Sequence, residues 1–154
     1  MTSPQARLRG DDGQVGGIEV LPFSLLIFVV GALLVANSWG VVDAKLAVVS
    51  AAREAVRSYV EAGDADSAAL AAVDAGRSVV AGHGRNPDRA AIEVHHDGDQ
   101  PYARCVRATV TVTYEVPAVA LPFIGGYGDA FEVRASQSEI VDPYRSGLPG
   151  SARC

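Results

Sequence analysis

The sequence of 154 residues contains no charged residue between Glu19 and Asp43. At about 1.5 Å rise per residue, a helix over this run is long enough to cross the roughly 30 Å hydrocarbon core of a bilayer once. Charged residues make up only 20% of the chain, and the residues outside the run leave room for one small domain of about 100 residues. The composition therefore predicts a single-pass membrane protein in contact with the lipid bilayer.

Basic clusters are absent too. The chain has one lysine, Lys45, and its net charge of −5 comes from acids and bases scattered along it. Without a Lys/Arg block, a nucleic acid is excluded as a partner. Positive residues on the two sides of the uncharged run are nearly balanced, Arg7 and Arg9 against Lys45, Arg53 and Arg57. The positive-inside rule alone thus does not orient the protein.

The N-terminus also has features of a secretory signal, with Ala36-Asn37-Ser38 as a small-residue cleavage pattern. Cleavage there would give a secreted, soluble protein that starts at Trp39. The uncharged run is, however, longer than the usual core of such a signal, and Asp11, Asp12 and Glu19 lie where signals carry no acids. These features favour a retained membrane anchor.

Beyond the uncharged run, apolar residues recur at three- and four-residue steps, which predicts an amphipathic helix continuous with the span. They are Val42, Leu46, Val49, Val56, Tyr59 and Val60. Gly63 should end this helix, and Asp64 or Asp66 can cap a second one that ends near Gly82. The apolar side of the second helix carries Leu70, Val73 and Val80.

The period changes to two over 105–116, where valine, alanine and tyrosine alternate with arginine, threonine and glutamate. This pattern predicts a strand with one buried face, with 91–96 and 131–136 as its neighbours. A small antiparallel sheet packed on the amphipathic helices would bury both apolar faces. The predicted fold class is therefore α+β, with an N-terminal transmembrane helix that continues into the domain.

These elements divide the chain into four parts. Residues 1–17 form a leader or cytoplasmic segment, 18–42 the transmembrane helix, 43–141 an extracytoplasmic α+β domain, and 142–154 a flexible tail rich in Pro, Gly and Ser. The apolar segment 116–124 contains two prolines, which make it a poor central strand. We expect it to be either a loop that covers the sheet or an exposed patch that contacts the membrane or another subunit.

Residues with the chemistry for catalysis or metal binding lack the required arrangement. His95 and His96 are adjacent on a strand and so point to opposite faces, and no His or Cys pair has ligand spacing. No nucleophile motif is present. We therefore expect no metal, no cofactor and no enzymatic activity. Cys105 and Cys154 are the two cysteines; they permit one disulfide in an oxidising exterior, or Cys154 stays free or pairs between molecules.

Motifs along most of the chain resemble those of TadE-like pilus assembly proteins, the minor pilins or pseudopilins of tight-adherence (Flp-type) pili. The resemblance is carried by four segments, namely Gly16-Gly17-Ile18-Glu19 before the membrane helix, Ala51-Ala52-Arg53-Glu54-Ala55-Val56-Arg57, Val110 to Pro117, and Leu121-Pro122-Phe123. It implies a bacterial envelope protein in the cytoplasmic membrane, with a cytoplasmic N-terminus and an extracytoplasmic domain. The implied partners are other pilin-like subunits, a pilus assembly platform and a prepilin peptidase.

The family pattern also gives Glu19 a role, because pilin leaders are cut after a glycine and leave a glutamate at the fifth mature position. A cut after Gln14 would give this position, whereas a cut after Gly13 would leave Glu19 sixth. A carboxylate at the hydrocarbon edge costs a few kcal/mol unless it reaches water or a cation. Glu19 therefore either pairs with the freed α-amine of a neighbouring subunit or marks the interfacial start of the span.

These observations lead to one expected function and one alternative. The expected function is non-enzymatic participation in assembling a tight-adherence pilus or a related secretion apparatus. The alternative is a membrane-tethered binding or sensory module that acts alone.

Overall fold

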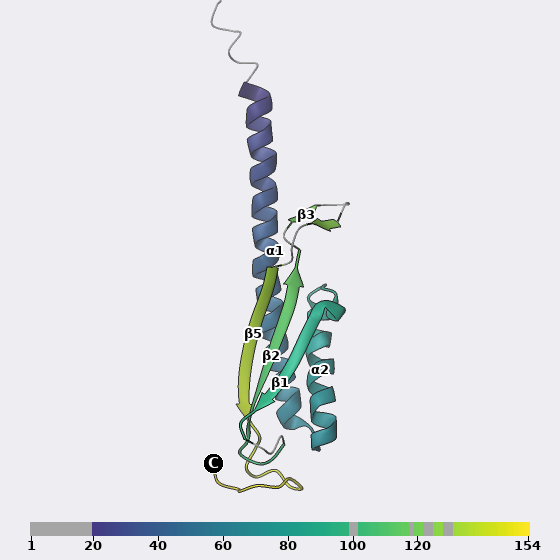
Figure 1. Ribbon diagram of the computed structural model, residues 1–154, viewed down its shortest axis with the longest axis vertical. Coiled ribbons are helices and arrows are strands. Elements are labelled where there is room, and N and C mark those ends of the chain that lie inside the picture. The colour runs from purple at the N-terminus through teal and green to yellow at the C-terminus, as the bar shows by residue number, and fades with distance from the viewer. Residues whose placement is uncertain (1–19, 99–101, 118, 122–124, 128–130) are drawn as a thin grey trace, which may run out of the picture. The chain divides into compact units, whose positions relative to one another are not determined.

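The computed structural model describes residues 20–98, 102–117, 119–121, 125–127 and 131–154. The elements in these ranges are α1 (Val20–Glu61), α2 (Ala65–Gly82), the 3-10 helix η2 (Pro87–Arg89), β1 (Ala90–His96), β2 (Arg107–Val116), β3 (Val119–Leu121), β4 (Gly125–Tyr127) and β5 (Phe131–Ile140) (Figure 1). The chain forms two compact units, one that ends at Ala36 and one that spans Asn37–Cys154. Helix α1 contributes to both units.

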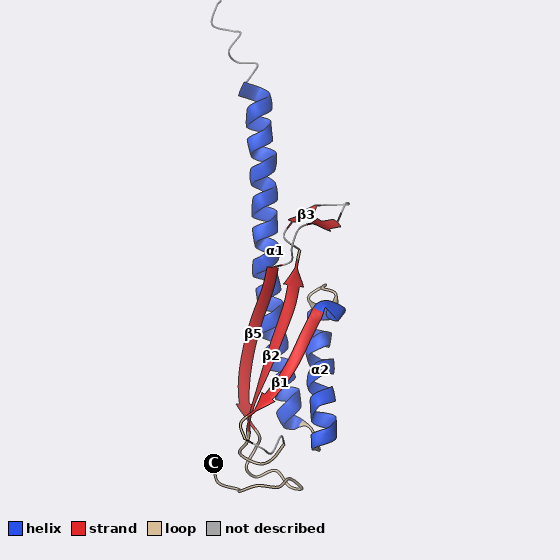
Figure 2. Cartoon of the chain, viewed as in Figure 1, coloured by secondary structure: helices blue, strands red, loops and turns tan. Residues whose placement is uncertain are grey.

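Three strands form the main antiparallel sheet in the order β1-β2-β5. Val112 of the central strand lies opposite Ile92 of β1 and Ala135 of β5. Helices lie against one face of this sheet (Figure 2). Alternation along β2 directs its apolar side chains into the core that the sheet shares with the helices. Those side chains are Ala108, Val110, Val112, Tyr114 and Val116. The predicted α+β fold and the predicted sheet are confirmed.

The outward face of the sheet carries hydroxyl groups that bond across strands. Thr109 Oγ1 lies 2.8 Å from Ser138 Oγ, and Thr111 Oγ1 lies 2.9 Å from Ser136 Oγ. Thr111 is only 4% exposed, although it lies on this outward face. Its bond to Ser136 satisfies a hydroxyl that its neighbours on three strands shield from water.

The helices bury the faces that the apolar spacing predicts only in part. Val56, Tyr59, Val60 and Val80 were predicted to lie on buried faces, and this is confirmed because all four are buried. In α1 the buried face is rich in alanine, and in α2 it consists of Ala68, Ala72, Gly76 and Val80. Val42, Leu46 and Leu70 were predicted to lie on buried faces, and this prediction is wrong because all three are exposed. Small side chains are favoured where backbones approach closely: a Cβ on Gly76 would lie 2.6 Å from Ile92 Cδ1 of β1 and 3.4 Å from Ala55 Cβ of α1.

Local sequence signals account for the ends of α2. Asp64 is its N-cap, and its carboxylate accepts a hydrogen bond of 2.9 Å from the backbone N–H of Ser67. This hydrogen bond stabilises the charged form and lowers the pKa of Asp64. At the other end, His83 follows the last helical residue and Gly84 adopts a positive φ of 71°.

The apolar segment 116–124 contains paired strand residues that the sequence did not predict. Val119–Leu121 and Gly125–Tyr127 form a separate two-stranded antiparallel sheet, in which Ala120 lies opposite Gly126. The two prolines of the segment are compatible with this pairing because Pro117 precedes β3 and Pro122 follows it.

Candidate functional site

The N-terminal part of α1 is an apolar helix whose large side chains are exposed. α1 is the one helix in the described part of the chain that is long and apolar enough to cross a membrane, and none of its most apolar 18-residue window is buried. Burying a large apolar side chain contributes about 1.5–3 kcal/mol. The exposed side chains include Leu21, Phe23, Leu25, Leu26, Ile27, Phe28 and Leu34. Moving this segment from water into an apolar environment such as a bilayer is therefore strongly favourable in free energy.

Exposed apolar side chains continue on α1 into the second unit. Trp39, Val42 and Leu46 are 72%, 51% and 59% exposed, and their spacing of three and four residues places them on one side of the helix. We call these three residues the apolar stripe. The opposite side of the same turns is fully buried and includes Ala44, Ala47 and Val48. This part of α1 thus has one apolar side packed in the domain and another that is open.

An ion pair fastens α1 to the domain at the first charged residue after the apolar run. Arg85 Nη2 lies 2.7 Å from Asp43 Oδ2 and donates a second hydrogen bond of 2.8 Å to the carbonyl oxygen of Gly40. The Arg85 guanidinium also lies 5.6 Å from the ring centroid of Tyr114 on β2. With its side chain only 16% exposed, Arg85 joins three elements, because its own backbone N–H bonds Val80 at the end of α2.

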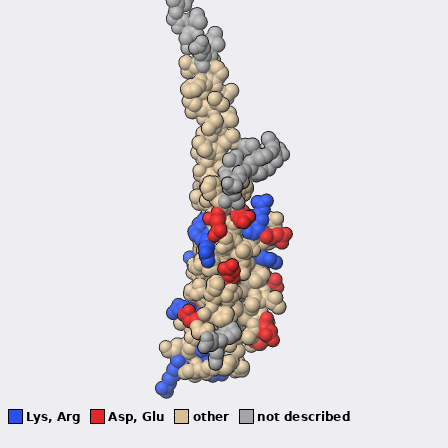
Figure 3. Space-filling view, in the orientation of Figure 1, with Lys and Arg blue, Asp and Glu red and all other residues tan. Residues whose placement is uncertain are grey.

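A second cation reaches the sheet from the apolar-stripe region of α1. Lys45 Nζ donates a hydrogen bond to the carbonyl oxygen of Arg134 on β5. In Figure 3 positive and negative side chains gather together on this end of the domain, whereas the apolar part of α1 shows neither colour. Along α1 the first charged residue is Asp43, but exposed apolar side chains continue beyond it to Leu46.

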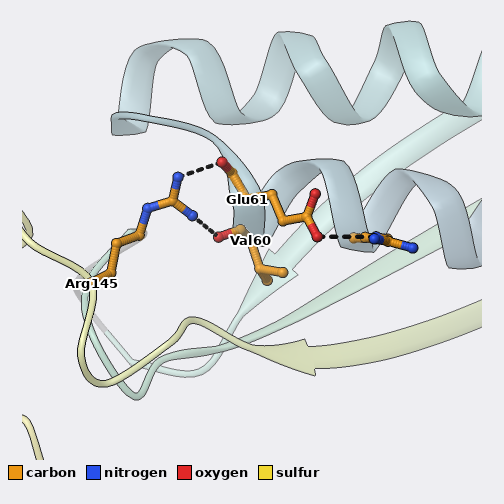
Figure 4. Close-up of polar contacts among 4 residues, drawn as sticks. Val60, Glu61 and Arg145 are labelled. Carbon is orange, nitrogen blue, oxygen red and sulfur yellow. Dashed lines mark hydrogen bonds and ion pairs between the residues drawn. The ribbon is translucent and has the colours of Figure 1, made fainter.

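Polar groups from distant parts of the chain cap the C-terminal end of α1. The last carbonyls of a helix have no partner within it and carry partial negative charge. The Arg145 guanidinium donates to the carbonyl oxygens of Val60, at 2.7 Å, and of Glu61 (Figure 4). The Tyr102 hydroxyl donates to the carbonyl oxygens of Val60 and Ala62. Arg145 thus supplies the positive charge that the last turn of α1 itself lacks.

Three aromatic rings pack beside this cap. The Tyr59 ring meets the Tyr102 ring edge-on with centroids 5.4 Å apart, and the His96 ring stacks on Tyr59 at 6.4 Å. Burial raises the pKa of Tyr59 and of Tyr102 above 10.0, and the nearby Arg145 guanidinium partly opposes the rise at Tyr102. Both phenols are therefore held in the neutral form that can donate a hydrogen bond.

Cys105 and Cys154 form a disulfide. Gly13, Gln14 and Glu19 lie outside the described residues, so their roles stay predictions.

The adjacent histidines separate as strand alternation predicts. His96 packs on Tyr59, whereas the exposed His95 lies 3.6 Å from the Glu93 carboxylate on the outward face. In the part of the chain that the structure describes, no group of three or more metal-ligating side chains comes together.

Sequence reasoning missed the contacts that fasten the two ends of α1. Arg85 is 42 residues from Asp43, and Arg145 is 85 residues from Val60. Both arginines stand in loop sequences where a single cation has no distinctive pattern. The apolar stripe could be noticed in the sequence, because Val42 and Leu46 are large and apolar. Their spacing, however, led to the prediction that they lie on the buried side of the helix, whereas both are exposed.

Comparison with protein-family models, with curated proteins and with solved structures finds no match for this chain.

We predict that Arg85→Lys lowers the free energy of unfolding by about 1–3 kcal/mol. Arg85 reaches both Asp43 and Gly40 through Nη2 while its planar guanidinium lies over the Tyr114 ring. A lysine has a compact ammonium on a flexible stem and no planar group to face the ring, so it holds these contacts less well. Urea unfolding of the full chain in detergent micelles measures the effect. The matched control is Arg77→Lys on the exposed side of α2, which should leave the curve unchanged. Equal curves for wild type and Arg85→Lys would contradict the fastening role.

The raised tyrosine pKa values predict alkaline destabilisation. Because the pKa of Tyr59 and Tyr102 is higher in the folded state than in the unfolded chain, their contribution to stability is complete below pH 10 and is lost as pH rises above it. Tyr102→Phe should cost about 1–2 kcal/mol at neutral pH and make the loss above pH 10 less steep. Tyr144→Phe, at a side chain 83% exposed, is the control at neutral pH. An unchanged alkaline slope in Tyr102→Phe argues against the cap.

Proposed function

We propose that the chain is a non-enzymatic, single-pass membrane subunit of an envelope assembly of the pilin kind, built by a tight-adherence pilus or a related secretion apparatus. The apolar part of α1 anchors it in the cytoplasmic membrane, with the N-terminus cytoplasmic and the α+β domain outside. Its partners are the bilayer, other pilin-like subunits, the assembly platform and, if the leader is cut, a prepilin peptidase. The motifs around Glu19 and over 110–117 support this assignment through their resemblance to TadE-like proteins.

The observation that carries the proposal is the apolar stripe. Leu46 lies about 10 Å beyond Trp39 along the helix axis, and it stays 59% exposed next to the charged residues Asp43 and Lys45. A tryptophan is typical of the membrane–water interface, because its side chain combines an apolar ring with a polar N–H group. A helix that served only as an anchor would need no exposed leucine two turns further on. An adjoining protein helix would cover Val42 and Leu46.

The burial pattern of α1 supports the same function. In the second unit one side of the helix is fixed under the sheet by Arg85 and Lys45, so the stripe is held on the open side. A subunit that binds neighbours through this helix needs its orientation fixed relative to the domain. The alternative, a tethered binding or sensory module that acts alone, has no use for an open apolar side on α1.

Membrane insertion is the first consequence to test. Leu26→Arg with Val30→Arg places two charges one turn apart near the middle of the apolar run, and each arginine at a span centre costs about 2.5–3.5 kcal/mol. We expect the wild type to stay with membranes after an alkaline carbonate wash and the double variant to be released. Leu70→Arg, at an exposed leucine of α2, should stay with the membranes. Release of the wild type contradicts the anchor.

Contact through the apolar stripe is the second consequence. A photoreactive amino acid at Leu46 should give crosslinks in membranes that map to the N-terminal apolar helix of another subunit, either a second copy or another pilin-like protein. The same probe at Leu70, which is also exposed, should give none. If the Leu46 probe reacts with lipid alone while the carbonate wash shows an anchored protein, the alternative of a module that acts alone is favoured.

A further inference from the structure

The segment 142–154 is attached to the domain although it contains no helix or strand. Its mobility stays a prediction from the sequence, but several contacts connect it to other elements. Arg145 bonds the last carbonyls of α1, the backbone N–H of Arg104 donates to the Pro149 carbonyl at 2.9 Å, and Cys154 is bonded to Cys105. Leu148 also packs against the core. The segment therefore runs between the end of α1 and the connection that leads into β2.

The backbone around the disulfide is shaped for this attachment. Cys105 has a positive φ of 65°, which is uncommon for a residue other than glycine. Its N–H donates to the Val141 carbonyl at 3.0 Å. Gly150 has a φ of 102°, and a Cβ there would lie 3.0 Å from the Arg104 carbonyl oxygen. The chain thus uses an unfavourable conformation at Cys105 and a glycine at position 150 to bring the two segments together.

Without the disulfide, the segment is held on the domain by the Arg145 hydrogen bonds, the Arg104–Pro149 hydrogen bond and the packing of Leu148. Ordering each residue costs conformational entropy comparable to the net gain from one hydrogen bond. Within the segment, Asp142 bonds the backbone of Tyr144 and Arg145, which forms a local turn. This turn orients Arg145 locally but does not hold the segment on the domain. The covalent bond at Cys154 therefore makes the largest difference to how long Arg145 stays on α1.

We infer that residues 142–154 form a redox-operated latch on the C-terminal end of α1. With the Cys105–Cys154 disulfide closed, Arg145 stays on the carbonyl oxygens of Val60 and Glu61. With the disulfide reduced, the segment leaves the domain and the last turn of α1 loses its cation. The latch acts within the second unit alone, so it does not rest on the proposed membrane function.

The chemistry of the latch is thiol–disulfide exchange with a dithiol reductant. A thiolate of the dithiol attacks one sulfur of the Cys105–Cys154 bond, the second sulfur leaves as a thiolate, and a mixed disulfide forms. The second thiol of the reductant then displaces the protein sulfur. Two electrons pass to the protein, which takes up two protons and holds two thiols, while the dithiol becomes a disulfide. Cys154 is exposed, so the reductant can reach it.

Hydrogen exchange of the full chain in detergent micelles tests the latch. Peptides covering 58–63 report the end of α1, and peptides covering 107–116 report the central strand. We expect reduction with dithiothreitol to speed exchange in 58–63 by about tenfold or more, the size expected for losing a hydrogen bond to a charged group. Exchange in 107–116 should not change. Intact mass confirms the gain of two hydrogens.

Variants separate the disulfide from the arginine. Cys154→Ser should exchange like the reduced wild type with no reductant present. Arg145→Gln should show the same fast exchange in 58–63 while its disulfide stays closed, and Arg77→Gln on α2 should behave as the wild type. Unchanged exchange in 58–63 on reduction, or in Arg145→Gln, would overturn the latch. Equal acceleration in 107–116 would also overturn it, because the disulfide would then support the whole domain.

Discussion

Burial of the alanine-rich side of α1 against the sheet and α2 is the interaction on which the rest of the structure depends. Ala44, Ala47, Ala51 and Ala55 are completely buried, and Gly76 lets α2 approach Ala55 of α1 and Ile92 of β1 closely. Because this side of the helix is packed in the domain, the helix cannot rotate about its axis, and its other side always faces away from the domain. The open apolar stripe and the polar contacts at both ends of the buried stretch follow from that constraint.

The fold could be predicted where a short stretch of sequence carries its own periodicity. Alternation over β2 fixed its buried face, and the caps and glycines marked both ends of α2. Leu70 and Leu46 show why the helix faces were predicted less well: large apolar residues stood out, yet the close packing required alanine and glycine, whose hydrophobicity is weak. Apolar spacing identifies a buried side correctly only when the larger side chains are the ones that pack.

The candidate site was harder to predict because its polar contacts join residues far apart in the chain. Asp43 and Arg85, or Val60 and Arg145, are brought together by the topology and not by any local pattern. A single arginine in a loop has many surface alternatives, and only the folded chain selects one. The disulfide was easier to predict. Two cysteines permit a single intramolecular pairing, so the bond between Cys105 and Cys154 was one of only a few alternatives.

Alanine has no side-chain torsion angles that could change to absorb a displacement. The buried side of α1 that carries Ala44, Ala47, Ala51 and Ala55 is therefore stiff, and a pull along the axis of α1 acts on the domain without being taken up by rearrangement of these side chains. In mechanical terms the domain is then loaded in shear along the buried side of α1. The polar contacts of Arg85 and Lys45 resist sliding, as do the buried side chains of Val48 and Val56. These two cations therefore bear a share of any load that α1 carries.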